Sequence, residues 1–493
     1  MASRLELISQ ERLDKVTRLR HAGIDPYPNR YPRTHTARQA ADLLTRIEGG
    51  ETQEDRVLVA GRIMANRSMG KSAFMDIRDS SGKIQLLFTN IKEMEETRLQ
   101  MFKDLDIGDF IGIEGAIART RTGEPTVKVE NWTLLSKSLL PLPDKWHGVS
   151  DVEVRYRQRY VDLISNNDVK EMFKVRSRII SAVRRFLDER DFLEVETPVL
   201  HPSAGGALAA PFITHHNALD QDFYLRIALE LHLKRLIVGG FDKVYEIGRV
   251  FRNEGISTTH NPEFTMIETY EAYADYRDVM KMQEELICQV SRQVLGTDEI
   301  EFDGNKISLT PPWQRITLRD AIKEYSGIDF AKYPTVADLA IKMRSMDLEV
   351  DPNKNWAKLV DELQKTCVRP KLIQPTILYD YPVSMSPLAK NKPGEERVVE
   401  RFQAVIAGLE VDNAYSELND PILQRQRFEE QLKERKESDE EKWSIDEDYL
   451  TALEYGMPPT GGLGIGIDRL VMLLTNRQSI REVILFPQLR DRD

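Results

Sequence analysis

The chain has 493 residues, which is too long for one ordinary domain and predicts two or three. Hydrophobic residues make up 41% and charged residues 30%, a balance typical of soluble globular proteins. The sequence contains no run of about 18 uncharged apolar residues, so we expect no membrane span. The formal net charge of −11 argues by itself against nucleic-acid binding but does not exclude it, because phosphate contacts depend on local basic patches.

The N-terminal segment and the cysteines indicate a cytoplasmic protein. The first residues, MASRLELISQERLDK, carry charges where a secretory signal needs an apolar core. The two cysteines, Cys288 and Cys367, form no CxxC or metal-binding spacing. We therefore interpret them as thiols in a reducing cytosol.

A helix is predicted over residues 5–22, within an N-terminal helical extension of residues 1–56. Apolar side chains recur there near helical spacing, and Arg12, Lys15 and Arg18 form a basic stripe. The stripe has two interpretations that the sequence leaves open. It is either a solvated helix face or an electrostatic contact with an RNA backbone.

Residues 57–137 change to short alternating segments rich in β-branched and aromatic residues. Turns of Gly, Asp and Ser separate them, and one predicted helix, KEMEETRLQMFKDL, follows the third segment. Five strands with a helix after the third predict a small Greek-key barrel of the OB type. The segments are VLVAGRIM, FMDIRD, KIQLLFT, DFIGIEGAIA and PTVKVENWTLL.

A linker is predicted over residues 138–160, followed by a second domain over residues 161–493. VRSRIISAVRRFLDERDF at 175–192 has a helical apolar face, and the strand-like FLEVETPVL follows it. From residue 200 onward, irregularly alternating strands and helices predict a mostly antiparallel sheet flanked by helices, with a helical insertion over about 317–370. The fold class is therefore α+β.

Two segments carry the most informative chemistry. Residues 251–268 read FRNEGISTTHNPEFTMIE, and residues 461–470 read GGLGIGIDRL, whose glycines do not fit the G-x-G-x-x-G spacing of a dinucleotide site. Together they resemble motifs 2 and 3 of the class II aminoacyl-tRNA synthetases. With SPLAK at 386–390 and NAYSELND at 413–420, HNPEFTM is most similar to the lysyl-tRNA synthetase family, and the resemblance runs from about residue 5 to the C-terminus.

The resemblance implies ATP-dependent activation of lysine and its transfer to tRNA(Lys). A carboxylate nucleophile is already ionised at pH 7, so the reaction needs charge at the phosphates and a held substrate, without a general base. The resemblance assigns the α-phosphate and the substrate carboxylate to Arg252 and the γ-phosphate to Arg469, as the two catalytic residues. The other ATP-binding residues that it implies are Glu254 at the adenine amino group, Phe264 stacked on adenine, His260, Asn261 and Glu410.

Lysine selection needs carboxylates at the far ammonium, because burying a cation without a partner is costly. The resemblance assigns this role to Glu268 and Glu417, and the α-amino group to Glu230 and the Gly206 backbone. The spacings Glu268-x-Tyr270 and Asn413-x-Tyr415-x-Glu417 each put side chains on one strand face. The lysine-binding set that it implies is Gly206, Glu230, Arg252, Glu268, Tyr270, Asn413, Tyr415 and Glu417.

The resemblance also implies Mg²⁺ at Glu410, a homodimer formed through the helix and strand after residue 175, and neither a membrane nor DNA as a partner. In the barrel it implies that Phe74 stacks on the anticodon and Gln85 hydrogen-bonds to it. Taken alone, an aromatic on a strand is more often a core residue. The anticodon-binding set is Arg67, Phe74, Gln85 and Glu124.

Three positions depart from the family pattern. Ala210 and Thr259 stand where an arginine is common, and Gln403 stands where the family has a second acid near Glu410. They motivate a second hypothesis, a paralogue with impaired adenylation that binds lysine or tRNA for regulation.

Two further alternatives are weaker. A ligase with a protein or lipid acceptor fits poorly with an intact barrel at 57–137. An aspartyl or asparaginyl enzyme would need a cationic group where this chain offers Glu268 and Glu417. Both arginines and both ammonium-binding glutamates remain, so we expect an active lysine–tRNA ligase.

Overall fold

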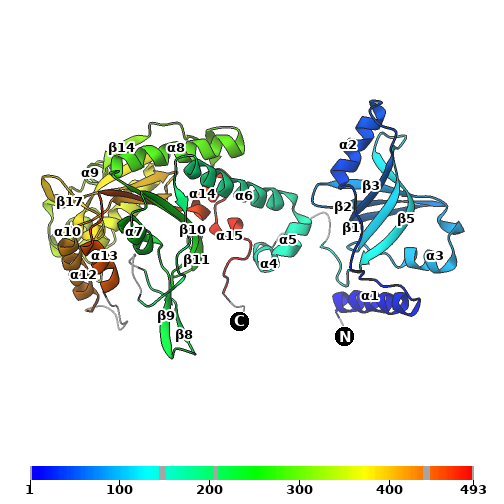
Figure 1. The fold of residues 1–493 in the computed structure, drawn as a ribbon, viewed down its shortest axis with the longest axis horizontal. Coiled ribbons are helices and arrows are strands. Elements are labelled where there is room, and N and C mark those ends of the chain that lie inside the picture. Colours follow the sequence, from blue (N-terminus) through cyan, green and yellow to red (C-terminus); the bar gives the residue numbers. More distant parts are fainter. Residues whose placement is uncertain (1–2, 144–150, 204–208, 437–444, 491–493) are drawn as a thin grey trace. The chain divides into compact units, whose positions relative to one another are not determined.

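The computed structural model describes residues 3–143, 151–203, 209–436 and 445–490. The chain divides into two compact units, Met1–Ser150 and Asp151–Asp493 (Figure 1). This division falls inside the predicted linker, residues 138–160. Among the described residues, no helix combines the length and the apolar character that a membrane crossing requires.

Unit 1 is built on a closed five-stranded barrel, which confirms the predicted OB-type fold. The strands pair in the order β1-β2-β3-β5-β4, and only β3 and β5 run parallel. Along β1 every second side chain from Val57 to Ala65 is buried, as expected for a strand with one face in the barrel core. The elements are α1 (Arg4–His21), α2 (Ala37–Glu48), β1 (Arg56–Met69), β2 (Ser72–Arg78), β3 (Lys83–Phe88), η1 (Ile91–Glu93), α3 (Glu96–Lys103), β4 (Phe110–Arg119) and β5 (Pro125–Ser136).

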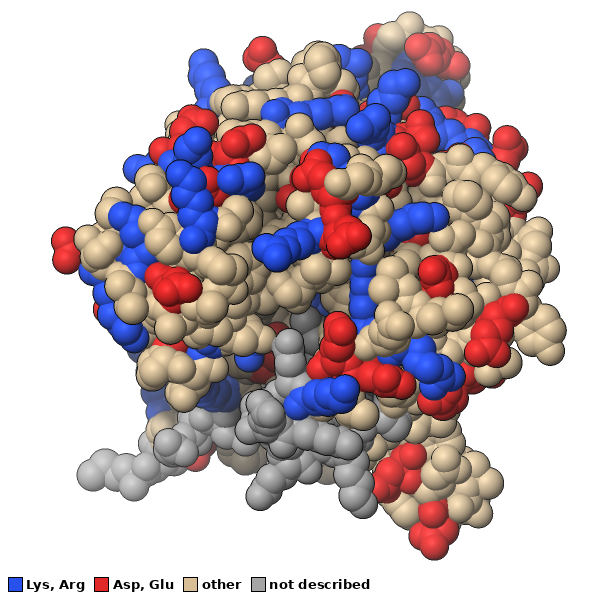
Figure 2. All heavy atoms as spheres, turned by 90° about the vertical axis from the view of Figure 1, so that its left-hand side faces the viewer, with Lys and Arg blue, Asp and Glu red and all other residues tan. Residues whose placement is uncertain are grey.

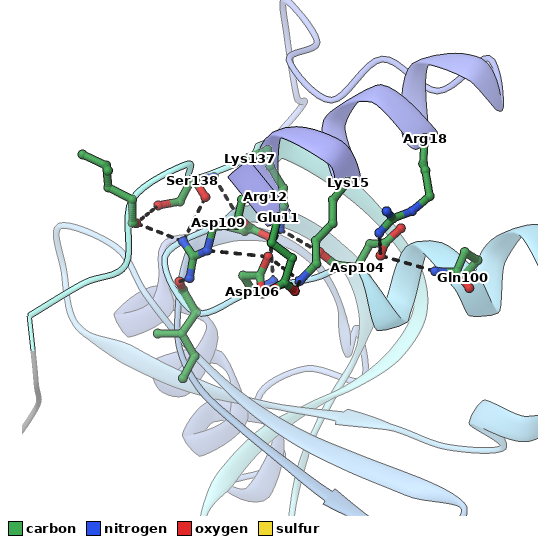
Figure 3. Close-up of polar contacts among 12 residues, drawn as sticks. Glu11, Arg12, Lys15, Arg18, Gln100, Asp104, Asp106, Asp109, Lys137 and Ser138 are labelled. Atoms are coloured by element: carbon green, nitrogen blue, oxygen red, sulfur yellow. Dashed lines mark hydrogen bonds and ion pairs between the residues drawn. The ribbon is translucent and has the colours of Figure 1, made fainter. Parts of the chain in front are cut away.

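The basic stripe of α1 packs on the barrel, so both sequence interpretations are wrong for two of its three residues. Lys15 donates to Asp106 at 2.8 Å, and Arg12 donates to the backbone carbonyls of Ser138 and Leu140 at 2.9 Å (Figure 3). Both side chains are buried, with 7% and 9% of Arg12 and Lys15 exposed. These two cations therefore face neither solvent nor RNA, because the barrel's own acceptors hold them.

Unit 2 is built on one large sheet whose path runs β14-β15-β17-β19-β20-β11-β10-β6. All pairs on this path are antiparallel except β14 with β15 and β10 with β6. The mostly antiparallel sheet predicted from the sequence is thus confirmed. Its strands are β6 (Leu193–Glu194), β10 (Lys243–Phe251), β11 (Glu263–Ala272), β14 (Gln314–Thr317), β15 (Thr376–Pro382), β17 (Glu395–Ile406), β19 (Asp412–Ser416) and β20 (Thr460–Gly466), with β16 (Asn391–Lys392) and β18 (Leu409–Glu410) paired to β17.

Two smaller sheets accompany the large one. The strands β7 (Leu200–His201), β9 (Gln221–Leu225) and β8 (Ile213–His216) pair in that order, and the β8–β9 hairpin projects from the rest of unit 2 (Figure 1). The strands β12 (Glu299–Phe302) and β13 (Asn305–Ser308) form a separate hairpin.

The large sheet has a different hydrophobic core on each face. One core joins α6 (Asn167–Asp188), α8 (Tyr276–Leu295) and α14 (Ile467–Leu474) to the side chains of Ile267, Leu463 and Ile465. In Figure 1, α6 and α8 lie side by side over the sheet. The alternate residues of the same strands point to the opposite face, where a second core joins α7 (Glu230–Val238), α9 (Leu318–Ser326) and α13 (Glu447–Glu454).

The predicted helical interval, about 317–370, contains α9, η2 (Phe330–Lys332), α10 (Val336–Arg344), α11 (Trp356–Leu363) and the π-helical turn η3 (Gln364–Val368), followed by η4 (Arg369–Lys371). Over the face of unit 2 drawn in Figure 2, Lys and Arg side chains lie interspersed with Asp and Glu side chains. The remaining elements are α4 (Val152–Arg157), α5 (Arg159–Ser165), α12 (Pro421–Lys436), α15 (Ile480–Val483) and η5 (Val383–Met385).

Candidate active site

A cavity of about 500 Å³ lies on the sheet face opposite α6 and α8. Its floor is made by alternate residues of β11, β20 and β19, and α7 contributes Glu230 and Leu231. Strand pairing sets Glu268, Gly464 and Asn413 in one row, and Tyr270, Gly462 and Tyr415 in the next. Alternation along β11 and β19 therefore brings these predicted residues to one cavity wall.

Gly462 must be a glycine because the floor is crowded there. A Cβ atom at this position would lie 1.9 Å from Oε1 of Glu417 and 2.7 Å from the ring of Tyr270. The glycine run GGLGIG thus makes room for side chains from neighbouring strands.

One end of the cavity gathers three buried carboxylates, those of Glu230, Glu268 and Glu417. Glu268 accepts hydrogen bonds from the Leu229 amide at 3.2 Å and the Tyr270 hydroxyl at 3.0 Å. Oε1 of Glu417 has no hydrogen-bond donor among the residues that the structure describes. This end of the cavity therefore offers an unused acceptor for a cation.

A fourth residue at this end, Lys234, was missed by the sequence analysis. Its fully buried ammonium donates to Glu230 Oε1 at 2.6 Å and forms an ion pair with Glu417. Burial alone would lower the pKa of Lys234, but the two carboxylates outweigh it and raise the pKa well above its ordinary value. The sequence did hold a signal, because Glu230 and Lys234 are four residues apart on one helix face.

The three carboxyl groups have one lysine as their counter-ion, so full ionisation would leave excess negative charge here, and burial raises the pKa of Glu417 well above its ordinary value although Lys234 opposes that rise. Burial, with the nearby charge of Glu230, raises the pKa of Glu268 to about 7. The Tyr415 hydroxyl donates to Glu230 at 2.7 Å, so the aromatic wall also orients the acids. A bound cation would relieve this excess charge and favour the ionised form of Glu268.

Asn413 and Gly206 are two further residues of the predicted lysine-binding set. The Asn413 side-chain oxygen accepts from Arg401 at 2.7 Å at the cavity floor. Gly206 lies outside the described residues.

The opposite end of the cavity is cationic. Arg252, Lys365, Arg369 and Arg401 line it. Arg469 adjoins it, donating to the Glu410 backbone carbonyl at 3.0 Å. Burial lowers the pKa of Arg252, whose guanidinium lies 5.2 Å from the ring centre of Phe264. One cavity thus presents the carboxyl groups of Glu230, Glu268 and Glu417 on one part of its lining and, on another, a group of cations of which Lys365 and Arg369 pair with Asp361 and Glu410.

The loop between β10 and β11 holds the other predicted ATP residues. Arg469 Nη2 lies 3.3 Å from His260 Nε2, so this nitrogen accepts and the Nδ1 proton points to Ser257 and Thr259. Asn261 is buried and used within the protein, donating to the Glu263 carbonyl at 2.7 Å and accepting from the Gln488 amide at 3.2 Å. Glu254 is exposed, and neither it nor Asn261 lines the cavity.

In unit 1 the predicted anticodon residues share the outer barrel face. Phe74 is half-buried and pairs with Arg67 on β1 and Leu87 on β3, outside the barrel core. Arg67 donates to Asp76 at 3.0 Å, Lys83 pairs with Glu124 at 3.5 Å, and Gln85 accepts from Thr126 at 2.9 Å. An aromatic surrounded by polar groups on an open face suits single-stranded bases.

Comparison with known proteins matches a different family to each of the two units of the chain. Residues 151–490 match the family described as tRNA synthetases class II (D, K and N), and residues 57–135 match the OB-fold nucleic acid binding domain. A lysine–tRNA ligase from Dehalococcoides mccartyi strain ATCC BAA-2266 is 59% identical over 99% of this chain and 98% of its own length. Lysine–tRNA ligases from Moorella thermoacetica and Bacillus cytotoxicus are 54% and 51% identical, over 98% and 97% of this chain and 97% and 96% of their own lengths.

The chain belongs to the lysine–tRNA ligase family of class II tRNA synthetases.

Within this family, two of the three departures, Thr259 and Gln403, make hydrogen bonds through their side chains. The Thr259 hydroxyl lies 3.1 Å from His260 Nδ1, and the Ala210 carbonyl accepts from the Asn253 amide at 2.8 Å. The Gln403 side-chain oxygen accepts from Gln364 and from the Tyr381 hydroxyl, both at 2.9 Å. Nothing in the structure explains the alanine at position 210, because the carbonyl bond there is one that any residue could make.

The predicted magnesium ligand Glu410 does not fit a protein-held Mg²⁺ as it lies. Its carboxylate pairs with Arg369 at 2.5 Å, and two donors already occupy the neighbouring amide oxygen of Gln403. Mg²⁺ needs free oxygen ligands in octahedral geometry. Among the described residues, no group of three or more His, Cys, Asp or Glu side chains is arranged to hold a metal ion.

Proposed function

We propose that this protein ligates L-lysine to tRNA(Lys) in two steps, using ATP. The lysine carboxylate attacks the α-phosphorus of ATP, forming lysyl-adenylate and releasing pyrophosphate. The 3′-hydroxyl of the terminal tRNA ribose then attacks the lysyl carbonyl and releases AMP. The cavity with carboxylates at one end and guanidinium groups at the other carries this proposal, because a cationic amino acid and a polyanion must bind side by side.

At the acidic end, Glu268 and the free oxygen of Glu417 would bind the side-chain ammonium. We assign the α-amino group to Glu230 and, from the family resemblance alone, to the Gly206 backbone, and we assign the methylene stem to Tyr415, with Tyr270 and Asn413 completing the wall. A charge-assisted hydrogen bond to a buried carboxylate is strong, so these contacts favour lysine over neutral amino acids.

At the cationic end, Arg252 would hold the substrate carboxylate against the α-phosphate, and Arg469 would hold the far phosphate. The carboxylate is a nucleophile without deprotonation, so catalysis here is positioning and charge stabilisation. Adenine would stack on Phe264 after displacing the Arg252 guanidinium from the ring, with Glu254, His260 and Asn261 shaping the loop around it. Mg²⁺ would enter as the counter-ion of ATP, whose phosphate oxygens bind it.

Three further proposals rest on the family. Phe74 and Gln85 would read the anticodon, with Arg67 and Glu124 beside them, so Phe74→Ala should weaken tRNA binding by about 1–3 kcal/mol while lysine activation stays unchanged. A homodimer would form through α6 and β6, doubling the 56.8 kDa chain mass in analytical ultracentrifugation. We place the protein in the cytoplasm, where its substrates are.

Lysine-dependent ATP–pyrophosphate exchange tests the function directly. Exchange with lysine, and none with ornithine, arginine or aspartate, is the expected result. A protein that binds lysine calorimetrically but shows no exchange would be the regulatory paralogue instead, and the ligase proposal would fail.

A further inference from the structure

Arg369 occupies the place between Glu410 and Gln403 at the cationic end of the cavity. Its Nη2 atom lies 2.5 Å from Glu410 Oε2 and 3.5 Å from the Gln403 side-chain oxygen. Arg369 and Lys365 both line the cavity, and both come from the η3–η4 turns of the helical insertion. A cation of the protein therefore lies between Glu410, the predicted magnesium ligand, and Gln403.

The position of Arg369 is fixed by backbone contacts. The turn that joins β17 to β18 donates twice to the segment after η4, from Ala407 to Ile373 at 3.0 Å and from Gly408 to Leu372 at 3.0 Å. These bonds tie the strand end that carries Glu410 to the turn that carries Arg369. The backbone of both residues is thus held in place by the fold, and the guanidinium of Arg369 reaches Glu410 from that fixed position.

The charge around Glu410 exceeds what one carboxylate needs. Arg369 and Arg469 both lie within 4.0 Å of it, and Lys365 lies in the same cavity, where it pairs with Asp361 at 2.6 Å. Arg252 adds another cation at the cavity wall. Such an excess of guanidinium groups suits phosphate oxygens, which they bind in bidentate fashion.

We propose that Arg369, with Lys365 beside it, binds the ATP phosphates and supplies the charge that a divalent cation held by Glu410 would otherwise supply. Glu410 then positions the guanidinium and holds no metal. The inference rests on the proposed use of ATP and goes beyond it, because it assigns a phosphate-binding residue and a weaker dependence on magnesium.

Calorimetric titration with ATP, in EDTA and in excess Mg²⁺, tests this assignment without any turnover. We expect the wild-type dissociation constants in the two buffers to agree within about tenfold. Arg369→Met should weaken binding in EDTA by about tenfold to 100-fold, the loss of one or two charge-assisted hydrogen bonds, and much less in Mg²⁺. Arg369→Lys, which keeps the charge, should restore part of the loss.

Matched controls separate a lost contact from a lost fold. Arg344→Met removes an exposed arginine of α10 in the same insertion and should change neither titration. Lysine affinity should stay unchanged in Arg369→Met, because the acidic end lies on α7, β11 and β19. The double variant Arg369→Met, Gln403→Glu would create an acid pair with Glu410 and should bind ATP only with Mg²⁺.

Two results would overturn the proposal. One is wild-type ATP binding that disappears in EDTA. The other is an Arg369→Met variant whose affinity for ATP in EDTA equals that of the wild type. The ligase proposal fails by a different measurement, the absence of lysine-dependent ATP–pyrophosphate exchange. ATP binding can still be measured by calorimetry in that case.

Discussion

Two clusters of buried charged residues in this protein differ in how their positive and negative charges balance. Where α1 meets the barrel, Arg12, Lys15 and Lys137 are each held by acceptors of the protein itself (Figure 3). At the acidic end of the cavity, three carboxylates share one lysine, and Oε1 of Glu417 stays without a donor among the described residues. Every cation of the first, closed cluster has an acceptor within the protein, and we propose that the ammonium of bound lysine completes the second, open cluster.

Removing the single cation of the open cluster should have the largest effect. Lys234→Met leaves Glu230 and Glu417 buried together without a counter-ion, which should cost about 3–5 kcal/mol of unfolding free energy. Added lysine should recover part of this loss, because its ammonium can replace the missing charge. Urea denaturation with and without lysine measures both effects, and Lys323→Met, on the exposed face of α9, is the matched control.

Replacing the carboxylate of Glu417 by a neutral amide should greatly weaken the use of lysine as a substrate. Glu417→Gln removes a buried charge partner, so kcat/KM for lysine in pyrophosphate exchange should fall roughly 100- to 1,000-fold. Glu429→Gln, an exposed glutamate of α12, should leave it unchanged. A Glu417→Gln enzyme with normal lysine kinetics would place the ammonium elsewhere.

A substitution in the closed cluster should lower the stability of unit 1 and leave lysine-dependent exchange unchanged. Lys15→Met removes a buried donor to Asp106 and should lower the unfolding free energy of unit 1 by about 1.5–3 kcal/mol. Lysine-dependent exchange should not change, because Lys15 lies far along the chain from every cavity residue and has no unused charge. Lys103→Met, exposed on α3, is the control, and a loss of exchange in Lys15→Met would break the distinction.

The affinity of the open cluster for lysine should also depend on pH. Burial and the charge of Glu230 raise the pKa of Glu268 to about 7, and we propose that lysine binds the ionised form. Protonation therefore competes with lysine below that pH, so affinity should fall by up to about tenfold per pH unit as the pH drops from about 7. Calorimetry in buffers of different ionisation enthalpy should record a proton released on binding near pH 6.5, and Glu268→Gln should abolish that release.

The sequence predicts the architecture well because periodicity and turn residues are local signals. The alternation of Glu268 with Tyr270, and of Asn413 with Tyr415, indicates a strand face from the residue spacing alone. The spacing does not indicate which strands lie next to one another. The close approach of Gly462 to Glu417 and Tyr270 therefore appears only in the fold.

Residues that act through distant partners escaped prediction. Lys234 is visible as a helix neighbour of Glu230, but its pairing with Glu417 joins residues far apart in the chain. Arg369 lies in an insertion with no recognisable motif, and only the fold brings it to Glu410. The basic stripe of α1 shows the opposite error, since nothing local marks Asp106 as the partner of Lys15.

A crystal structure with lysine bound would show directly which groups complete the open cluster. We predict the lysine side-chain ammonium within hydrogen-bonding distance of Glu268 and of Oε1 of Glu417, with Lys234 still paired to Glu230. An ammonium bound away from both carboxylates, or a Lys234 side chain displaced from the cluster, would contradict this prediction.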